Sequence, residues 1–155
     1  MNILYIKGDA TIPFGNGNKV ITHICNNVGG WGRGFVLALS QRWKLPEEAY
    51  RQWYKSKENF ILGEVQFVQV EKDICVANMI GQNNLSIRNG VPPIRYDAVQ
   101  ACLKKVADFA LQTQSSVHMP RIGCGLAGGK WEIIEKIINE ELISKNISVT
   151  VYDLV

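Results

Sequence analysis

The chain has 155 residues, of which 46% are hydrophobic and 20% are charged, and its formal net charge is +3. At roughly 150 residues per domain, this length predicts one domain over residues 1–155, large enough to bury a core without disulfides or a metal. The composition excludes a disordered, collagen-like or low-complexity chain. The small charge, with no basic stripe, disfavours nucleic acid as the main ligand.

The cysteines and the N-terminal residues bear on metal binding and on location. Cys25, Cys75, Cys102 and Cys124 form no Cys-x-x-Cys pair, and no histidine stands at ligand spacing. We therefore expect reduced thiols, no metal site and no cofactor. The apolar run Met1–Ile6 is too short for a signal peptide, and no stretch approaches the roughly 18 apolar residues of a membrane span. These features predict a cytoplasmic protein with no membrane partner.

The first half of the chain predicts two strands followed by two helices. Asn2–Ile6 predicts a strand that a glycine ends, and Lys19–Cys25 predicts a strand that is apolar on both faces. Such a strand is typical of a sheet that helices cover on both sides. A glycine-rich loop at residues 26–34 leads into a helix that begins at Phe35 and ends before Pro46. A second helix is predicted over Glu47–Lys57.

The second half begins with a predicted hairpin and then alternates helices with strands. The hairpin joins Glu64–Glu71 to Ile74–Ile80. After it the pattern predicts, in order, a polar loop at Gly81–Pro93, a helix at Arg95–Gln112, a strand at Ser116–Pro120, a glycine-rich loop at Ile122–Lys130, a helix from Trp131 and a strand at Ile147–Tyr152. This alternation predicts an α/β protein, a three-layer α/β/α sandwich with a mixed central sheet.

The later of the two glycine-rich segments, residues 122–130, is called the second glycine loop. Its residues Gly123–Gly128 match the pattern G-x-G-x-x-G between a predicted strand and a predicted helix. Glycines there let main-chain N–H groups approach a diphosphate, and the helix N-terminus favours negative charge. Asp153 even ends the following strand, but only two residues come after it, too few for a half that would hold a nicotinamide. The pattern therefore predicts a diphosphate site without hydride transfer.

The first glycine loop, residues 26–34, also lies between a predicted strand and a predicted helix. Two such loops at the carboxyl ends of strands suggest one crevice that holds a ligand from two sides. The alternative is that these glycines only form tight turns and helix caps.

Segments along nearly the whole chain resemble the macrodomain family, whose members bind ADP-ribose. The segments occur in the family's order: Lys7–Thr11 is similar to its adenine-side motif, Ile24–Asn27 with Gly29–Gly34 to its distal-ribose loop, Met119–Leu126 to its phosphate loop, and Val149–Tyr152 to its last strand. The resemblance implies ADP-ribose or a derivative as ligand, either free or attached to a protein partner.

The resemblance is to a branch that includes ADP-ribose-1″-phosphate phosphatases and ADP-ribosyl-glutamate hydrolases. The glutamate-hydrolysing members carry an Asp after Gly-Cys-Gly-Leu, where this chain has Ala127. They also carry a Lys after the strand that corresponds to Ile74–Ile80, whereas between Asp73 and Arg95 this chain has only Arg88 as a cation. A guanidinium stays protonated and is a poor nucleophile, so the Lys/Asp mechanism is not expected here.

The resemblance implies a set of ligand-binding residues on these segments. Asp9 would accept a hydrogen bond from the adenine amino group, or it would only stabilise a turn. Tyr152 would pack near the base, or it would belong to the core. The whole set comprises Asp9, Ala10, Asn26, Asn27, Gly30, Trp31, Gly32, Arg33, Ile122, Gly123, Cys124, Gly125, Leu126, Ala127, Gly128 and Tyr152.

Asn27 and His23 are the candidate catalytic residues. The amides of Asn26 and Asn27 can donate to and accept from ribose hydroxyls, and Arg33 would either pair with a terminal phosphate or remain a solvated charge. His23 would act as an acid/base near the ribose, or it would be a hydrogen-bonded core histidine. Cys124 is not expected to be a phosphatase nucleophile, because no Cys-x₅-Arg cradle follows it.

Three functions remain open at this point. The first is an enzyme that binds ADP-ribose derivatives and hydrolyses the phosphate monoester of ADP-ribose-1″-phosphate. The second is an ADP-ribose reader module without chemistry. The third is a mono-ADP-ribosyl-protein hydrolase that lacks the Lys/Asp pair.

Overall fold

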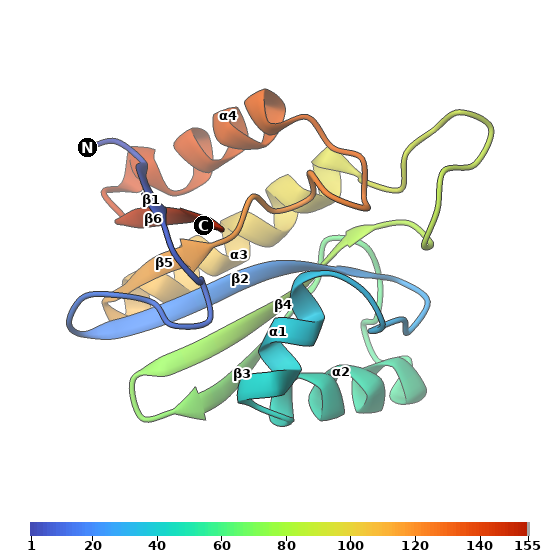
Figure 1. Ribbon diagram of the computed structural model, residues 1–155, viewed down its shortest axis with the longest axis horizontal. Helices are drawn as coiled ribbons and strands as arrows, with labels where there is room; N and C mark the ends of the chain where they lie inside the picture. The colour runs from blue at the N-terminus through green and yellow to red at the C-terminus, as the bar shows by residue number, and fades with distance from the viewer. Residues whose placement is uncertain (155) are drawn as a thin grey trace.

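The computed structural model describes residues 1–154 and contains a six-stranded mixed sheet with the strand order β1-β6-β5-β2-β4-β3 (Figure 1). Five neighbouring strands are parallel, and only β3 runs antiparallel, to β4. The strands are β1 (Leu4–Lys7), β2 (Asn18–Asn26), β3 (Val65–Glu71), β4 (Ile74–Gln82), β5 (Ser115–Met119) and β6 (Val149–Asp153).

Helices cover both faces of this sheet. One face carries α1 (Phe35–Arg42) and α2 (Leu45–Ser56), and the other carries α3 (Tyr96–Thr113) and α4 (Trp131–Glu141), as Figure 1 shows. A short 3₁₀ helix at Ile143–Lys145 follows α4. The predicted three-layer α/β/α sandwich is therefore confirmed. Within residues 1–154, none of the helices combines the length and apolar character that crossing a bilayer requires.

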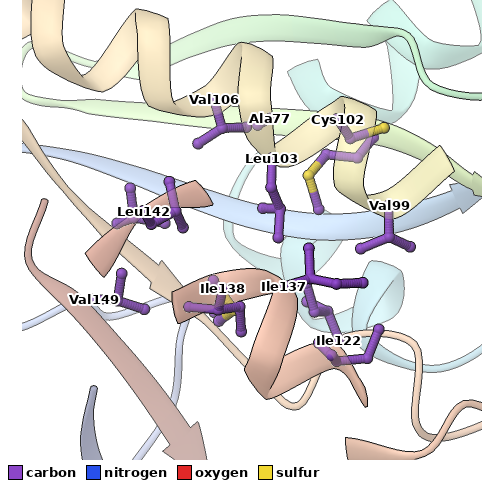
Figure 2. Packing of buried hydrophobic residues seen from close by; sticks show 14 of the residues in the cluster. Ala77, Val99, Cys102, Leu103, Val106, Ile122, Ile137, Ile138, Leu142 and Val149 are labelled. Atoms are coloured by element: carbon purple, nitrogen blue, oxygen red, sulfur yellow. The ribbon is translucent and has the colours of Figure 1, made fainter. Parts of the chain in front are cut away.

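Two hydrophobic clusters, one on each face, explain why β2 and β4 are apolar on both sides. Val20 of β2 packs under α3 and α4, whereas the next residue, Ile21, packs under α1 and α2. Side chains of successive strand residues point to opposite faces, so a central strand needs apolar residues at consecutive positions. Figure 2 shows residues of the larger cluster, among them Val99 and Leu103 of α3 and Ile138 of α4.

The ends of several strands differ from their predicted positions because a strand extends as far as its partner allows. The first strand spans Leu4–Lys7 instead of Asn2–Ile6, in register with Thr150–Asp153 of β6. The predicted hairpin of β3 and β4 is confirmed, but β4 continues through Gly81 to Gln82, where it pairs with Asn26. The last strand begins only at Val149, because the N–H of Ile147 still donates to the carbonyl of Leu142.

The parallel arrangement positions the functional site. Parallel strands place all their carboxyl ends at one edge of the sheet, so the segments that follow β2, β4 and β5 gather there (Figure 1). These segments are the first glycine loop, residues 83–95 and the second glycine loop.

All four cysteines are free thiols, and Cys124 is the one that is not fully buried.

Candidate functional site

A cavity of about 1020 Å³ lies at this edge of the sheet, between the two glycine loops and the segment after β4. The predicted residues that border it are His23, Asn26, Gly30, Trp31, Gly32, Arg33, Ile122, Gly123, Gly125, Leu126 and Ala127. The two loops therefore form one crevice, as their positions after strands indicated.

The first glycine loop is folded around the side chain of Asn26, which is only 7% exposed. Its Oδ1 accepts hydrogen bonds from the N–H groups of Val28 and Gly30, at 3.0 and 2.9 Å, and from the Tyr50 hydroxyl at 2.9 Å. Its Nδ2 donates to the carbonyl of Gly30 at 2.8 Å. Both ends of this carboxamide form hydrogen bonds within the protein, so its main role is to hold the loop in place.

Asn27 does not border the cavity, in contrast to the prediction that it contacts the distal ribose. Its Nδ2 donates to Oδ1 of Asn83 and its Oδ1 accepts from the N–H of Asn84, both at 2.8 Å. Both bonds reach the segment after β4, so they occupy the Asn27 carboxamide. Asn27 joins two walls of the cavity, which is a scaffolding contact, and its catalytic role stays a prediction.

The end of the first glycine loop exposes a run of unpaired main-chain donors. Trp31 of this loop is buried, with its indole N–H on the Ser40 hydroxyl at 2.8 Å. After it, the N–H groups of residues 32–36 make no hydrogen bond to any described residue of the chain. Helix α1 begins within this run, at Phe35, and the residue before it, Gly34, has a φ of 78°. These donors lie at the positive end of α1 and border the cavity.

Main-chain hydrogen bonds hold the shape of the second glycine loop, which also contains a run of N–H groups without a partner among residues 1–154. The N–H of Gly129 donates to the carbonyl of Gly123 at 2.7 Å, and that of Gly128 to Gly125 at 3.1 Å. At Gly129 a Cβ would lie 2.5 Å from the Gly123 carbonyl oxygen, so this close approach requires glycine. Within residues 1–154, the N–H groups of residues 125–127 have no partner.

His23 has the surroundings of a core histidine. It is 2% exposed, its Nε2 lies 2.6 Å from Oδ1 of Asn78, and its ring meets Trp31 edge to face. An amide oxygen only accepts, so Nε2 carries the proton. Burial lowers the pKa of His23 to about 4, because the charged form is poorly solvated there. A group with this pKa is neutral at pH 7 and is a weak base, which argues against an acid/base role.

The predicted adenine-side residues hold a neighbouring loop and do not border the cavity. Oδ1 of Asp9 accepts from the N–H and the hydroxyl of Thr11, at 2.8 and 2.7 Å. Ala10 is buried, and the Tyr152 hydroxyl accepts from the N–H of Phe14 while it contacts His118. The contacts of Asp9 are those expected of a residue that stabilises a turn. The contacts of Tyr152 are those expected of a core residue.

Cys124 and Gly128 belong to the second glycine loop but also lie outside the cavity lining. The Cys124 thiol points back to the carbonyl of Ile122, 3.5 Å away, and burial raises its pKa. This thiol is protonated at neutral pH, which agrees with the exclusion of a covalent cysteine phosphatase.

The structure adds lining residues that the sequence reasoning missed. They come from the ends of β2 and β4, the segment after β4, the end of the first glycine loop with the start of α1, and the two residues before the second glycine loop: Ile24, Cys25, Gly34, Phe35, Val36, Gln82, Leu85, Ser86, Ile87, Pro120 and Arg121. Arg121 could have been found, since it lies within Met119–Leu126, the segment that resembles the phosphate loop. Leu85–Ile87 carry no such signal, because only the pairing of β4 with β2 brings them to the crevice.

The ionisable side chains that border the cavity are His23, Cys25, Arg33 and Arg121. Arg121 forms a two-bond pair with Asp153, and this pairing lowers the pKa of that carboxyl. Arg33 makes no ion pair within residues 1–154. With no carboxylate or lysine in its lining, the cavity suits an anion.

Among the described residues, no group of three His, Cys, Asp or Glu side chains could hold a metal ion.

Known proteins are similar to this chain at the level of sequence, although no protein-family model matches it. The chain is 30% identical over 159 residues to chromodomain-helicase-DNA-binding protein 1-like of Mus musculus, which covers 97% of this chain. It spans less than a fifth of that protein and of its Danio rerio counterpart. It is also 26% identical over 146 residues to the ADP-ribose 1″-phosphate phosphatase of Candida albicans, covering 89% of this chain and 92% of that protein.

Solved structures are similar over the whole chain. A Bacteroides thetaiotaomicron protein of unknown function is 70% identical with a TM-score of 0.99, and the match covers 99% of both chains. Thermosipho africanus DarTG in complex with ADP-ribose shares the fold at 18% identity and a TM-score of 0.71, covering 88% of this chain and 38% of that one. A macrodomain protein from Streptomyces coelicolor is 51% identical with a TM-score of 0.89, over 98% of this chain and 99% of that chain. The chain therefore belongs to the macrodomain family.

Proposed function

We propose that this protein binds ADP-ribose in the cavity between its two glycine loops. One observation carries the proposal: residues 32–36 and 125–127, whose main-chain N–H groups have no partner among residues 1–154, border one cavity from two sides. A diphosphate presents oxygens in several directions, so it can accept hydrogen bonds from both runs at once. The positive end of α1 adds a favourable interaction with the same negative charge.

The size and lining of the cavity support a ligand larger than a free diphosphate. Small-molecule sites usually enclose roughly 300–1,000 Å³, and this cavity of about 1020 Å³ lies at the upper end of that range. Apolar side chains such as Phe35 and Leu126 border it alongside the glycines. The DarTG structure of the same fold was solved with ADP-ribose, and the Candida albicans relative is named for an ADP-ribose derivative.

The chemistry of the lining favours a reader of free or protein-attached ADP-ribose. A hydrolase usually needs a base with a pKa near the working pH. Here His23 is neutral with a pKa of about 4, and burial raises the pKa of the Cys25 thiol well above its usual value. Ala127 brings a methyl group to the cavity where the glutamate-hydrolysing relatives have their aspartate. Lysine-dependent removal of ADP-ribose from proteins is therefore disfavoured.

Removal of the phosphate from ADP-ribose-1″-phosphate is the second candidate function. Arg33 favours it, because this cation, which makes no ion pair within residues 1–154, borders the cavity beside the N–H groups at the start of α1. A guanidinium and several N–H donors can hold a terminal phosphate while water attacks the phosphorus atom. The phosphatase relative supports the same substrate.

Titration calorimetry with ADP-ribose, ADP, AMP and NAD tests the binding proposal. We expect ADP-ribose to bind at least about tenfold more tightly than AMP, a difference of about 1.4 kcal/mol, because AMP has a single phosphate and no distal ribose. Equal affinities for the two ligands would contradict the proposal, since the first glycine loop would then contribute nothing.

Phosphate release from ADP-ribose-1″-phosphate separates the enzyme from the reader. Turnover by the parent protein that falls in the Arg33→Ala variant, with ADP-ribose binding retained, would support the phosphatase. Binding of ADP-ribose-1″-phosphate without phosphate release would leave the reader as the function.

A further inference from the structure

Arg121 occupies a rigid position at the wall of the cavity. Its Nε lies 2.6 Å from Oδ1 of Asp153 and its Nη2 lies 3.0 Å from Oδ2, so the carboxylate holds one edge of the guanidinium in its plane. The side chain is nevertheless 41% exposed and borders the cavity. A fixed and accessible guanidinium differs from an ordinary surface arginine, which loses conformational freedom when it binds a ligand.

Two aromatic rings lie beside the guanidinium of Arg121. The guanidinium carbon lies 5.1 Å from the ring centroids of both Tyr5 and Trp131. The two ring centroids are 6.3 Å apart and the rings meet edge to face, so Arg121 lies in the corner between them. The rings are themselves held, since the Trp131 indole donates to the Tyr5 hydroxyl at 3.1 Å and that hydroxyl donates to Glu135.

The two arginines of the cavity consequently offer different chemistry. Arg33 has no ion-pair partner among residues 1–154 and presents a free positive charge. Asp153 pairs with Arg121, yet 41% of the Arg121 side chain stays exposed at the wall of the cavity. A planar guanidinium stacks well on aromatic rings and on nucleobases.

We propose that Arg121, fixed by Asp153, Tyr5 and Trp131, is the stacking surface for the nucleobase of the bound ligand. The proposal rests on ADP-ribose binding in the cavity and adds the residue that recognises the base. It also explains why Asp9, which points its Oδ1 at Thr11 and does not border the cavity, need not define the base end of the site.

The Arg121→Lys variant tests the proposal, because lysine keeps the charge beside Asp153 and removes the plane. We expect its affinities for ADP-ribose and AMP to fall about tenfold and its affinity for inorganic pyrophosphate to change less than about twofold. Arg51→Lys is the matched control, since Arg51 also pairs with a carboxylate, Glu47, but lies outside the cavity lining. Unchanged ADP-ribose affinity in Arg121→Lys, or an equal loss of pyrophosphate affinity, would overturn the proposal.

A measurement on the parent protein covers the case in which the variant folds poorly. The Arg121 Nε–H is held by Asp153, and its NMR resonance should shift when a nucleobase stacks on the guanidinium. We expect AMP and ADP-ribose to shift this resonance and pyrophosphate with ribose 5-phosphate to leave it in place. Binding of ADP-ribose without such a shift would overturn the stacking proposal, whereas absence of any ADP-ribose binding would refute the proposed function instead.

Discussion

The first and second glycine loops follow neighbouring parallel strands and border the same cavity, but they are built in different ways. In the first, the Asn26 carboxamide satisfies the N–H groups of Val28 and Gly30. In the second, the shape depends on main-chain bonds such as the one from Gly129 to Gly123. Among the described residues, both loops leave a run of main-chain N–H groups without a partner. We therefore expect the first loop to lose stability when a side chain is removed from it. We expect the second loop to lose ligand affinity when a side chain is added to it.

The largest effect is expected for Gly125→Val in the second glycine loop. A Cβ at Gly125 meets no atom within 4 Å, and its φ is not in the left-handed region, so the variant should fold. The added side chain would occupy the space beside the free N–H groups, and calorimetry should show ADP-ribose affinity reduced about 1,000-fold, or about 4 kcal/mol.

Gly123→Ala is the contrasting variant in the same loop. Gly123 has a φ of 74°, and a Cβ there would lie 2.7 Å from Cδ1 of Ile94, so this change should lower the melting temperature. A folded Gly125→Val protein with the parent affinity would refute the role of the second glycine loop.

Asn26→Ala should lower the free energy of unfolding, because it removes hydrogen bonds that hold the first glycine loop. It leaves the N–H groups of Val28 and Gly30 without their acceptor, whereas the Tyr50 hydroxyl keeps the main-chain carbonyl of Asn26 at 2.7 Å. An unsatisfied buried group costs about 1–3 kcal/mol, and these two N–H groups are part-buried, so we expect about 2 kcal/mol less unfolding free energy in urea titrations. Asn27→Ala, which loses only the two contacts to Asn83 and Asn84, should cost about 1 kcal/mol. Equal midpoints for the two variants would remove the distinction between these asparagines.

Stability should fall in mild acid because of two buried histidines. Burial lowers the pKa of both His23, beneath the first glycine loop, and His118 to about 4. The unfolded chain, with histidine pKa values near 6.5, binds more protons below that pH, so the stabilisation is complete above pH 6.5 and is lost as the pH falls toward 4. At pH 5.5 we expect a loss of about 1.4 kcal/mol per histidine.

Urea unfolding at pH 7.5 and pH 5.5 checks this dependence. His118→Gln and His23→Gln should each reduce the difference between the two pH values, whatever their effect at pH 7.5. An unchanged pH dependence in His23→Gln would show that His23 is not a neutral core group, and an acid/base role would then regain support.

The smallest effect is expected for Arg33→Ala, at the exposed end of the first glycine loop. Loss of its charge should weaken ADP-ribose-1″-phosphate binding about fivefold more than ADP-ribose binding, which is about 1 kcal/mol. Because the charge is solvent-exposed, the difference should shrink at high salt. Calorimetry at low and high ionic strength checks both points, and equal losses for the two ligands would place Arg33 away from the terminal phosphate.

The sequence alone determined the layers of the fold and the place of the cavity. Consecutive apolar residues such as Val20 and Ile21 require a strand covered on both faces, and glycines after two such strands predict a crevice at their carboxyl ends. The G-x-G-x-x-G pattern also indicated free main-chain donors, because glycine contributes no side chain to cover them. These properties depend on neighbours along the chain, and local sequence patterns record them.

Only the tertiary structure decided what the polar side chains do. Asn26 and Asn27 are adjacent and chemically identical, yet one satisfies its own loop with Tyr50 and the other reaches residues 83 and 84. Arg121 acquires its fixed plane from Asp153, Tyr5 and Trp131, which come from β6, β1 and α4. Whether a hydrogen-bonding group is paired within the protein or is available to a ligand depends on the partners that the fold brings to it. Those partners lie far away in the sequence, so no local pattern reveals them.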